Sequence, residues 1–353
     1  MEGKELRNEF NKVHSDYSLL SKKIESVMSD FLDAENLVVH SISCRCKTLD
    51  SLELKAQKKH EKNTPYLSLD EITDLSGVRI ITHFSSDLDK IADLVEREFD
   101  IDFLNSVDKR EYQDPEKFGY ASIHYVVSFN SARLALPEYS KFAGLKAEIQ
   151  IRSILQHAWA EIEHDIGYKA DVEIPRDIRR RFSRLSGLLE LADQEFEAIR
   201  TELDEYAKVV RESPDFKLSS IAIDKTSLHS FVFSNEYVGS LDEDICKILQ
   251  AKLCEPSFDA GEIQALEFLG FKTLGDILAG LHNYRELILQ RAHDVNDIHG
   301  ISSGLVCGGV SIAYLMQVFA AESDDENTIN GFLRLLELDH DSSFFDYLLG
   351  FNK

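Results

Sequence analysis

Lys146-Ala147-Glu148-Ile149-Gln150-Ile151-Arg152 is the stretch that decides the fold of this chain. Polar and apolar residues alternate along it without a break, which predicts a β-strand with a polar face made of Lys146, Glu148, Gln150 and Arg152. β-Rich runs over residues 78–84 and 122–129 predict further strands, and residues 87–99 are expected to form a helix between strands. We therefore expect an α/β core of roughly 130 residues bracketed by helices.

Heptad-spaced apolar residues precede and follow this core. Spacings of four and three residues alternate from Leu6 to Phe31 and again from Ile178 to Val210, which predicts two long helices. The first helix is expected either to pack on its own domain or to form an oligomer contact, and the two apolar seams are expected to pack on each other. Because the second helix is predicted to end near Pro214, we expect one domain over residues 1–213 and a mostly helical one over 214–353.

The composition of the 353 residues bounds the classes of function. Hydrophobic residues make up 43% of the chain, which is enough for a packed core, and the net charge of −24 disfavours a general coat for nucleic acid. Residues 214–353 hold nine basic and 22 acidic residues, so we expect an acidic cap that regulates the protein or binds a partner.

Five cysteines without a framework spacing predict reduced thiols in a cytoplasmic protein. The uncharged run over residues 298–321 is interpreted as buried helices, and no membrane is expected as a partner.

One basic stretch stands out, from Arg45 to Lys59. It carries a local charge of +3, and a helix from Ser51 onward would bring Ser51, Lys55, Lys58 and Lys59 to one face. Such a stripe fits a polyphosphate, and a solvated helix face is an equally weighted alternative.

Two carboxylates, Asp74 and Glu148, precede or lie on predicted strands near Arg79. Nucleotide-bound Mg²⁺ takes one or two carboxylates together with phosphate oxygens, and an arginine neutralises a transferring phosphate. The spacing alone is weak evidence, because acidic residues are common at strand ends.

Two further motifs carry aromatic or histidine side chains. Tyr120 lies in Phe118-Gly119-Tyr120, where its ring is expected either to stack on a base or to pack in the core. A predicted helix over residues 156–169 brings His157, Glu161 and His164 near one face, which superficially suggests a metal site. We favour polar contacts that support a nucleotide pocket.

Taken together, these motifs resemble the synthetase domain of the RelA/SpoT family, especially its small alarmone synthetases. The resemblance rests on five blocks in order: Arg45-x-Lys47 with Ser51, Lys55 and Lys58; Asp74-Leu-x-Gly-x-Arg79; Gly119-Tyr120-x-Ser122-x-His124; Glu148-Ile-Gln150-Ile-Arg152; and Trp159-Ala-x-Ile-Glu163-His164 with Tyr168-Lys169. The resemblance implies a mixed, nucleotidyltransferase-like sheet and the transfer of pyrophosphate from ATP to the ribose 3′-oxygen of GTP or GDP.

The resemblance also implies roles for individual residues. ATP would be bound by Arg45, which stacks on adenine, and by Lys47, Ser51, Lys55, Lys58 and Arg79. Asp74 and Glu148 would bind Mg²⁺, with Glu148 also the candidate base and Arg79 a further catalytic residue. The acceptor nucleotide would be bound by Tyr120, His124, Gln150, His157 and Glu163.

Alternatives remain open at this point. Ala121 stands where many relatives have a cation, which leaves the acceptor undecided among GDP, GTP and an adenosine nucleotide. Some toxic members of the family modify the 3′ end of tRNA, and exposed basic helix faces such as Arg179 to Arg181 would dock it. A nucleotide sensor without turnover is a third interpretation, and a homo-oligomer is compatible with all of them.

Overall fold

A six-stranded mixed sheet forms the centre of the first part of the chain. The computed structural model describes residues 3–108, 122–168, 175–299, 304–338 and 342–351. Its strands are β1 (Val39–Cys46), β2 (Ser76–Thr82), β3 (Phe99–Ile101), β4 (Val107–Asp108), β5 (Ile123–Phe129) and β6 (Ala147–Ser153). They pair in the order β1-β2-β6-β5-β3, with β4 added to β5, and β2 and β6 are parallel while the other pairs are antiparallel. The predicted α/β class with a mixed sheet is confirmed.

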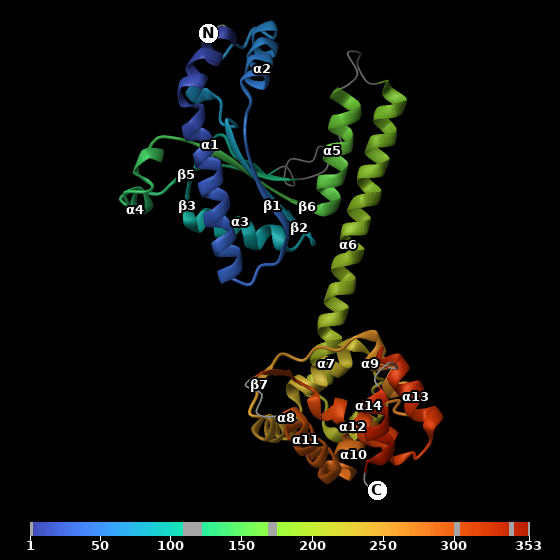
Figure 1. Ribbon diagram of the computed structural model, residues 1–353. Coiled ribbons are helices and arrows are strands. Elements are labelled where there is room, and N and C mark those ends of the chain that lie inside the picture. The colour runs from blue at the N-terminus through green and yellow to red at the C-terminus, as the bar shows by residue number, and fades with distance from the viewer. Residues whose placement is uncertain (1–2, 109–121, 169–174, 300–303, 339–341, 352–353) are drawn as a thin grey trace. The chain divides into compact units, whose positions relative to one another are not determined.

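The apolar face of this sheet is covered by α1 (Gly3–Ala34) and α3 (Asp87–Glu98), as Figure 1 shows. α1 contacts β1, β2 and β6, and α3 contacts β3, β5 and β6. Ala147, Ile149 and Ile151 of β6 are fully buried beneath these helices, as the alternating pattern predicts. The seam of α1 is buried in the same core, with Leu6 and Phe10 at 0% exposure. Of the two roles expected for this seam, packing on its own domain is therefore the one observed.

Shorter helices connect the strands and leave part of the opposite face open. They are α2 (Leu49–Glu61), the 3₁₀ turn η1 (Leu69–Glu71), α4 (Ser131–Leu134), η2 (Ser140–Phe142) and α5 (Ile154–Tyr168). α2 begins at Thr48, whose side chain accepts a hydrogen bond from the backbone N–H of Ser51. α5 contacts β2 and β6, where Ile81 and Arg152 are buried. The polar face is therefore closed at its α5 end.

The long helix α6 (Arg176–Glu212) differs from the sequence expectation. Its apolar seam was expected to pack on that of α1, but Leu185 and Phe196 are each 52% exposed and Ile199 is 51% exposed. Within the first unit the buried residues of α6 are polar, Ser186 and Asp193, and Asp193 accepts a 2.8 Å hydrogen bond from Ser153 Oγ. The expectation fails because heptad spacing reports an apolar stripe and not which surface covers it.

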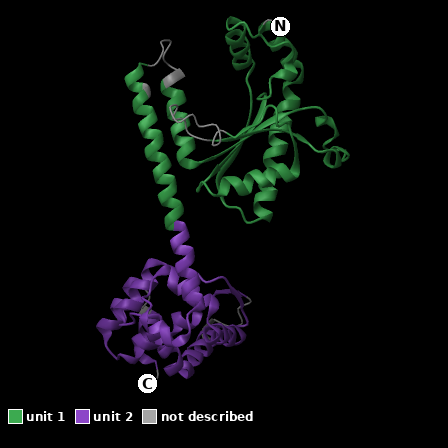
Figure 2. Ribbon diagram, turned by 180° about the vertical axis from the view of Figure 1, so that it is seen from behind, with its two compact units in different colours: residues 1–199 green, residues 200–353 purple. Residues whose placement is uncertain are grey.

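The chain divides into two compact units, residues 1–199 and 200–353, which Figure 2 shows in green and purple. The second unit holds the end of α6 and the following helices: η3 (Asp215–Ser220), α7 (Lys225–Ser234), α8 (Glu236–Leu249), α9 (Ala260–Phe268), α10 (Leu274–Asn283), α11 (Arg285–His299), α12 (Val310–Glu322), α13 (Glu326–Leu335) and α14 (Ser342–Gly350). Two short strands, β7 (Lys252–Cys254) and β8 (Leu305–Cys307), pair in parallel.

The second unit is mostly helical, as predicted, and has its own core. Gly270, with φ +94°, forms the turn between α9 and α10. Among the described helices, none combines the length and apolar composition needed to cross a bilayer.

Candidate active site

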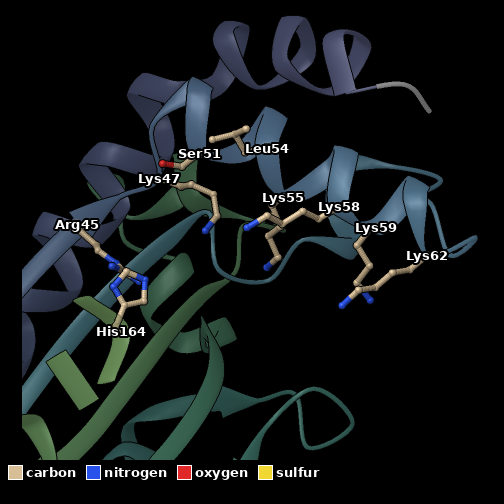
Figure 3. Close-up of a pocket in the computed structure, with 9 residues that line it drawn as sticks. All are labelled: Arg45, Lys47, Ser51, Leu54, Lys55, Lys58, Lys59, Lys62 and His164. Atoms are coloured by element: carbon tan, nitrogen blue, oxygen red, sulfur yellow. The ribbon is translucent and has the colours of Figure 1, made fainter. Parts of the chain in front are cut away.

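A basic cavity of about 590 Å³ lies beside α2 (Figure 3). Six cations face it and none of its lining residues is a carboxylate; the lining consists of Arg45, Lys47, Ser51, Leu54, Lys55, Lys58, Lys59, Lys62 and His164. Figure 3 shows the lysines of α2 reaching toward the same space. The five residues predicted to bind ATP from the basic stretch therefore come together. Lys62 lies four positions after Lys58, so the helical spacing that selected the others would also have found it.

A second, smaller cavity of about 80 Å³ lies over the start of β2 and β6. It is lined by Ser43, Cys44, Arg45, Asp74, Gly77, Val78, Arg79, Glu148 and Gln150. Arg45 lines both cavities, so the basic cavity and this one are adjacent. The two carboxylates named from the sequence thus lie in one place, next to the lysines.

Strand register explains how these residues meet. Gly77 lies between Arg45 on β1 and Glu148 on β6, and Arg79 lies opposite Gln150. On the other side of β6, Gln150 pairs with His124 of β5. Because side chains at paired positions share a face, the register forms a polar row across the middle of the sheet. Gly77 has no side chain, which leaves space between Arg45 and Glu148.

Asp74 lies in the loop before β2 and is held by two lysines. Its carboxylate oxygens lie 2.8 Å from Lys47 Nζ and 2.8 Å from Lys55 Nζ. Burial by itself would raise the pKa of the Asp74 carboxyl, but hydrogen bonds from both lysines outweigh burial and hold that pKa below its ordinary range. Asp74 is therefore ionised at neutral pH, with two ammonium groups placed where a bound cation would lie.

Glu148 accepts hydrogen bonds on both carboxylate oxygens. His124 Nδ1 lies 2.8 Å from Oε1, and Gln150 Nε2 donates to Oε2 at 2.9 Å. Ser122 Oγ lies 2.8 Å from His124 Nε2, so a proton on Nδ1 leaves Nε2 to accept from Ser122. Burial alone would raise the pKa of Glu148, but the contacts from His124 and then Gln150 keep it below the ordinary value. Sequence reasoning did not assign Ser122 a role, although it lies in the block that carried His124.

A cluster of arginines borders the carboxylates on the α5 side. Arg79 donates a 2.8 Å hydrogen bond to Glu161 of α5, and His157 Nδ1 lies 3.8 Å from the same carboxylate. Arg152 is only 7% exposed, and its burial, together with the charge of Arg79, lowers its pKa to about 10. Burial followed by the charges of Arg79 and Arg152 also lowers the pKa of His157.

The remaining predicted positions lie apart from these cavities or outside the described residues. Glu163 is exposed on α5 and lines neither cavity. Tyr120 and Ala121 lie outside the described residues. In the part of the chain that is described, no group of three or more His, Cys, Asp or Glu side chains has the arrangement of a metal site. A metal here would therefore depend on oxygen atoms from a ligand as well as on the protein.

Fold and site together define a class of protein: a mixed-sheet domain with a basic cavity next to a partly buried pair of carboxylates. Residues 44–173 match the model of the region found in RelA/SpoT proteins. Over these residues the chain is similar to that family, as the sequence motifs predicted.

Two curated relatives and one solved structure are also similar to part of this chain. The chain is 29% identical over 176 residues to the GTP pyrophosphokinase YwaC of Bacillus subtilis (strain 168), which covers 50% of this chain and 80% of that protein. It is 29% identical over 168 residues to YjbM, another GTP pyrophosphokinase of that organism, covering 47% and 74%. The crystal structure of small alarmone synthetase 1 from Bacillus subtilis aligns with 23% identity and a TM-score of 0.47, over 56% of this chain and 99% of that one.

Proposed function

We propose that this protein transfers pyrophosphate from ATP to the ribose 3′-oxygen of GTP or GDP and so makes a guanosine alarmone. The observation that carries the proposal is the adjacency of the basic cavity to the cavity that holds Asp74 and Glu148. The names of the two curated relatives, both GTP pyrophosphokinases, support the same reaction. The local excess of lysine in a chain of net charge −24 directs a polyanion to this one cavity.

The donor is held by the residues around α2. Lys47, Lys55 and Lys58 bind the triphosphate, and the guanidinium plane of Arg45 stacks on the adenine. Ser51 donates its hydroxyl to a phosphate oxygen. Six cations around one cavity compensate the charge of ATP, so binding is expected to weaken as salt rises.

The transfer itself requires an attack on the β-phosphorus of ATP. The acceptor 3′-oxygen forms a bond to this phosphorus, the bond to the bridging α,β-oxygen breaks, and AMP leaves. Glu148 accepts the 3′-hydroxyl proton, and His124 and Gln150 fix the orientation of its carboxylate. Arg79 neutralises charge that develops on the transferred group.

We propose Mg²⁺ as the metal that Asp74 and Glu148 hold. Both are partly buried carboxylates on one cavity, which is the oxygen donor set that Mg²⁺ takes together with phosphates. The two ammonium groups on Asp74 support this, since they mark a position that favours positive charge. When bound, Mg²⁺ supplies charge neutralisation for the phosphates. Lys47 and Lys55 would then turn from Asp74 to phosphate oxygens.

The acceptor would lie on the β5 side of Glu148. His124 and Gln150 are adjacent to Glu148 there, and His157 lies farther along near Arg79 and Arg152. Tyr120 is the candidate to stack on the acceptor base, with Glu163 a further candidate contact.

An acceptor panel tests the proposal. The purified full-length protein is incubated with ATP labelled on the γ-phosphate and, in parallel, with GDP, GTP, ATP or tRNA. We expect label in a new guanosine nucleotide that carries more charge than its acceptor. Label on tRNA or on an adenosine nucleotide would instead support the alternatives weighed from the sequence, and nucleotide binding without transfer would support a sensor.

We also propose that the protein is a homo-oligomer whose second copy covers the exposed seam of α6. Leu185, Phe196 and Ile199 follow coiled-coil spacing and are about half exposed. Light scattering should give a multiple of the 40.2 kDa chain mass, and Phe196→Glu should reduce it. A monomeric wild-type protein would contradict this part of the proposal.

A further inference from the structure

A pair of cysteines faces each other across the small sheet of the second unit. In the register of the parallel strands β7 and β8, Cys254 lies directly opposite Cys307. The two Sγ atoms are 3.4 Å apart. Neighbouring strands lie about 4.8 Å apart, which falls within the Cα separations that a disulfide bridges. The backbone is thus already spaced for a disulfide, and rotation of the two side chains is enough to bring the sulfur atoms together.

Backbone hydrogen bonds fix the two strands on both sides of this pair. Lys252 N donates to Gly304 O at 3.0 Å, and Gly308 N donates to Cys254 O at 3.0 Å. Immediately after β8, buried Asp242 of α8 accepts hydrogen bonds from the backbone N–H groups of Gly309 and Ser311. The strands that carry both cysteines are therefore held in register by their surroundings, and formation of a disulfide would not require the fold to rearrange.

Cys254 and Cys307 are more exposed to solvent than Cys246, the third cysteine of the same unit. Cys307 is exposed and Cys254 is partly exposed, whereas Cys246 is only 7% exposed. An oxidant in solution can reach Cys307 first, and Cys254 is next to it as the resolving thiol. The hydrogen bond with Cys254, followed by burial, raises the pKa of Cys307 and so lowers its thiolate fraction at neutral pH, and the reaction with peroxide is therefore expected to be slow.

We propose that Cys254 and Cys307 are a modification site that forms a reversible intramolecular disulfide. The oxidant is a peroxide: the thiolate of Cys307 attacks one peroxide oxygen, which gives a sulfenic acid and releases one water. The thiolate of Cys254 then attacks that sulfur, forming the S–S bond and releasing a second water. Two thiols are oxidised by two electrons in total and one peroxide is reduced, and a dithiol reductant reverses the change.

The disulfide would link two positions that are 53 residues apart in the sequence. Closing a loop of that length restricts the unfolded chain, so oxidation should raise the thermal midpoint of the second unit by roughly 5–10 °C. The proposal does not depend on the transfer reaction, because the pair lies in the second unit and the carboxylates lie in the first.

The test uses the full-length protein, reduced and then treated with hydrogen peroxide. Thiols titrated in denaturant should fall from five to three per chain, and peptide mass mapping should show residues 254 and 307 joined. Cys307→Ser should abolish the joined peptide, while Cys246→Ser should keep it. Dithiothreitol should restore all five thiols and the lower thermal midpoint.

The proposal is overturned if peroxide leaves five thiols, joins other cysteines, or carries Cys307 to a sulfinic acid without a cross-link. Mapping on the wild-type protein is independent of how the serine variants fold. An unchanged thermal midpoint in a protein shown to be cross-linked would overturn the stabilising effect.

Discussion

Replacing Asp74 with asparagine separates the two tasks assigned to its carboxylate, which are holding lysines and holding a metal. The carboxylate lies 2.8 Å from both Lys47 and Lys55, and its side chain is 22% exposed. A hydrogen bond between charged groups contributes about 1.5–3 kcal/mol. The Lys47 contact, with that lysine only 14% exposed, contributes about 2 kcal/mol within this range. The Lys55 contact is worth at most about 1 kcal/mol, since that lysine is 36% exposed.

The two contacts together predict that Asp74→Asn lowers the free energy of unfolding by about 2–3 kcal/mol. For a unit of 199 residues this corresponds to a fall of about 5–10 °C in the thermal midpoint. Differential scanning calorimetry of the full-length variant measures this. Asp70→Asn, an exposed substitution of the same type in the same loop, is the matched control and should change the midpoint by less than about 2 °C.

Asp74→Asn should affect nucleotide affinity and the rate of transfer differently. In EDTA, Asp74→Asn should bind a non-hydrolysable ATP analogue as tightly as the wild type or more tightly, because Lys47 and Lys55 no longer pair with a carboxylate. With Mg²⁺, its rate of transfer should fall by about a hundredfold or more. The reasoning is refuted if the variant is as stable as the wild type and transfers at the wild-type rate.

Three further predictions concern pH, the basic cavity and the second unit. The pKa of Glu148 lies below its ordinary value of 4.5, so the carboxylate remains ionised down to about that pH. A pH–rate profile should therefore show no loss of activity from this group above about pH 5. An acid limb near pH 7 that moves in Glu148→Asp would contradict this prediction. Lys62→Ala should raise the KM for ATP by about three- to tenfold at low salt and leave kcat nearly unchanged, which initial-rate measurements test. A three- to tenfold fall in kcat would contradict a role for Lys62 in binding alone. Asp242→Ala leaves the N–H groups of Gly309 and Ser311 without their acceptor, so chemical denaturation should show a free energy of unfolding lower by about 2–4 kcal/mol. A change below about 0.5 kcal/mol would contradict a stabilising role for these two hydrogen bonds.

Local sequence patterns predicted those parts of the site that local geometry determines. Strict alternation in residues 146–152 was enough to assign the strand and its two faces, because the strand period is two. Helical spacing was enough to bring Ser51, Lys55 and Lys58 to one side of α2. Each of these predictions depends only on neighbours within a few residues.

Pairing between distant segments could not be predicted in the same way. The parallel pairing of β2 with β6 brings Gly77 next to Glu148, although 71 positions separate them in the sequence. Nothing in either strand specifies that partner, since register depends on the packing of the whole sheet. The expectation for the α6 seam failed for the same reason. The heptad pattern indicates an apolar stripe, and only the three-dimensional structure shows what covers it.

The products of one reaction test most directly whether Glu148 and Asp74 take part in a transfer of pyrophosphate. The purified protein is given GDP, Mg²⁺ and ATP labelled on the γ-phosphate, and AMP, ADP and labelled guanosine nucleotide are quantified together. The account predicts AMP and a 3′-pyrophosphorylated guanosine in equal amounts from the wild type, and at least about a hundredfold less of both from Glu148→Gln. ADP in place of AMP, or an undiminished yield from Glu148→Gln, would contradict it.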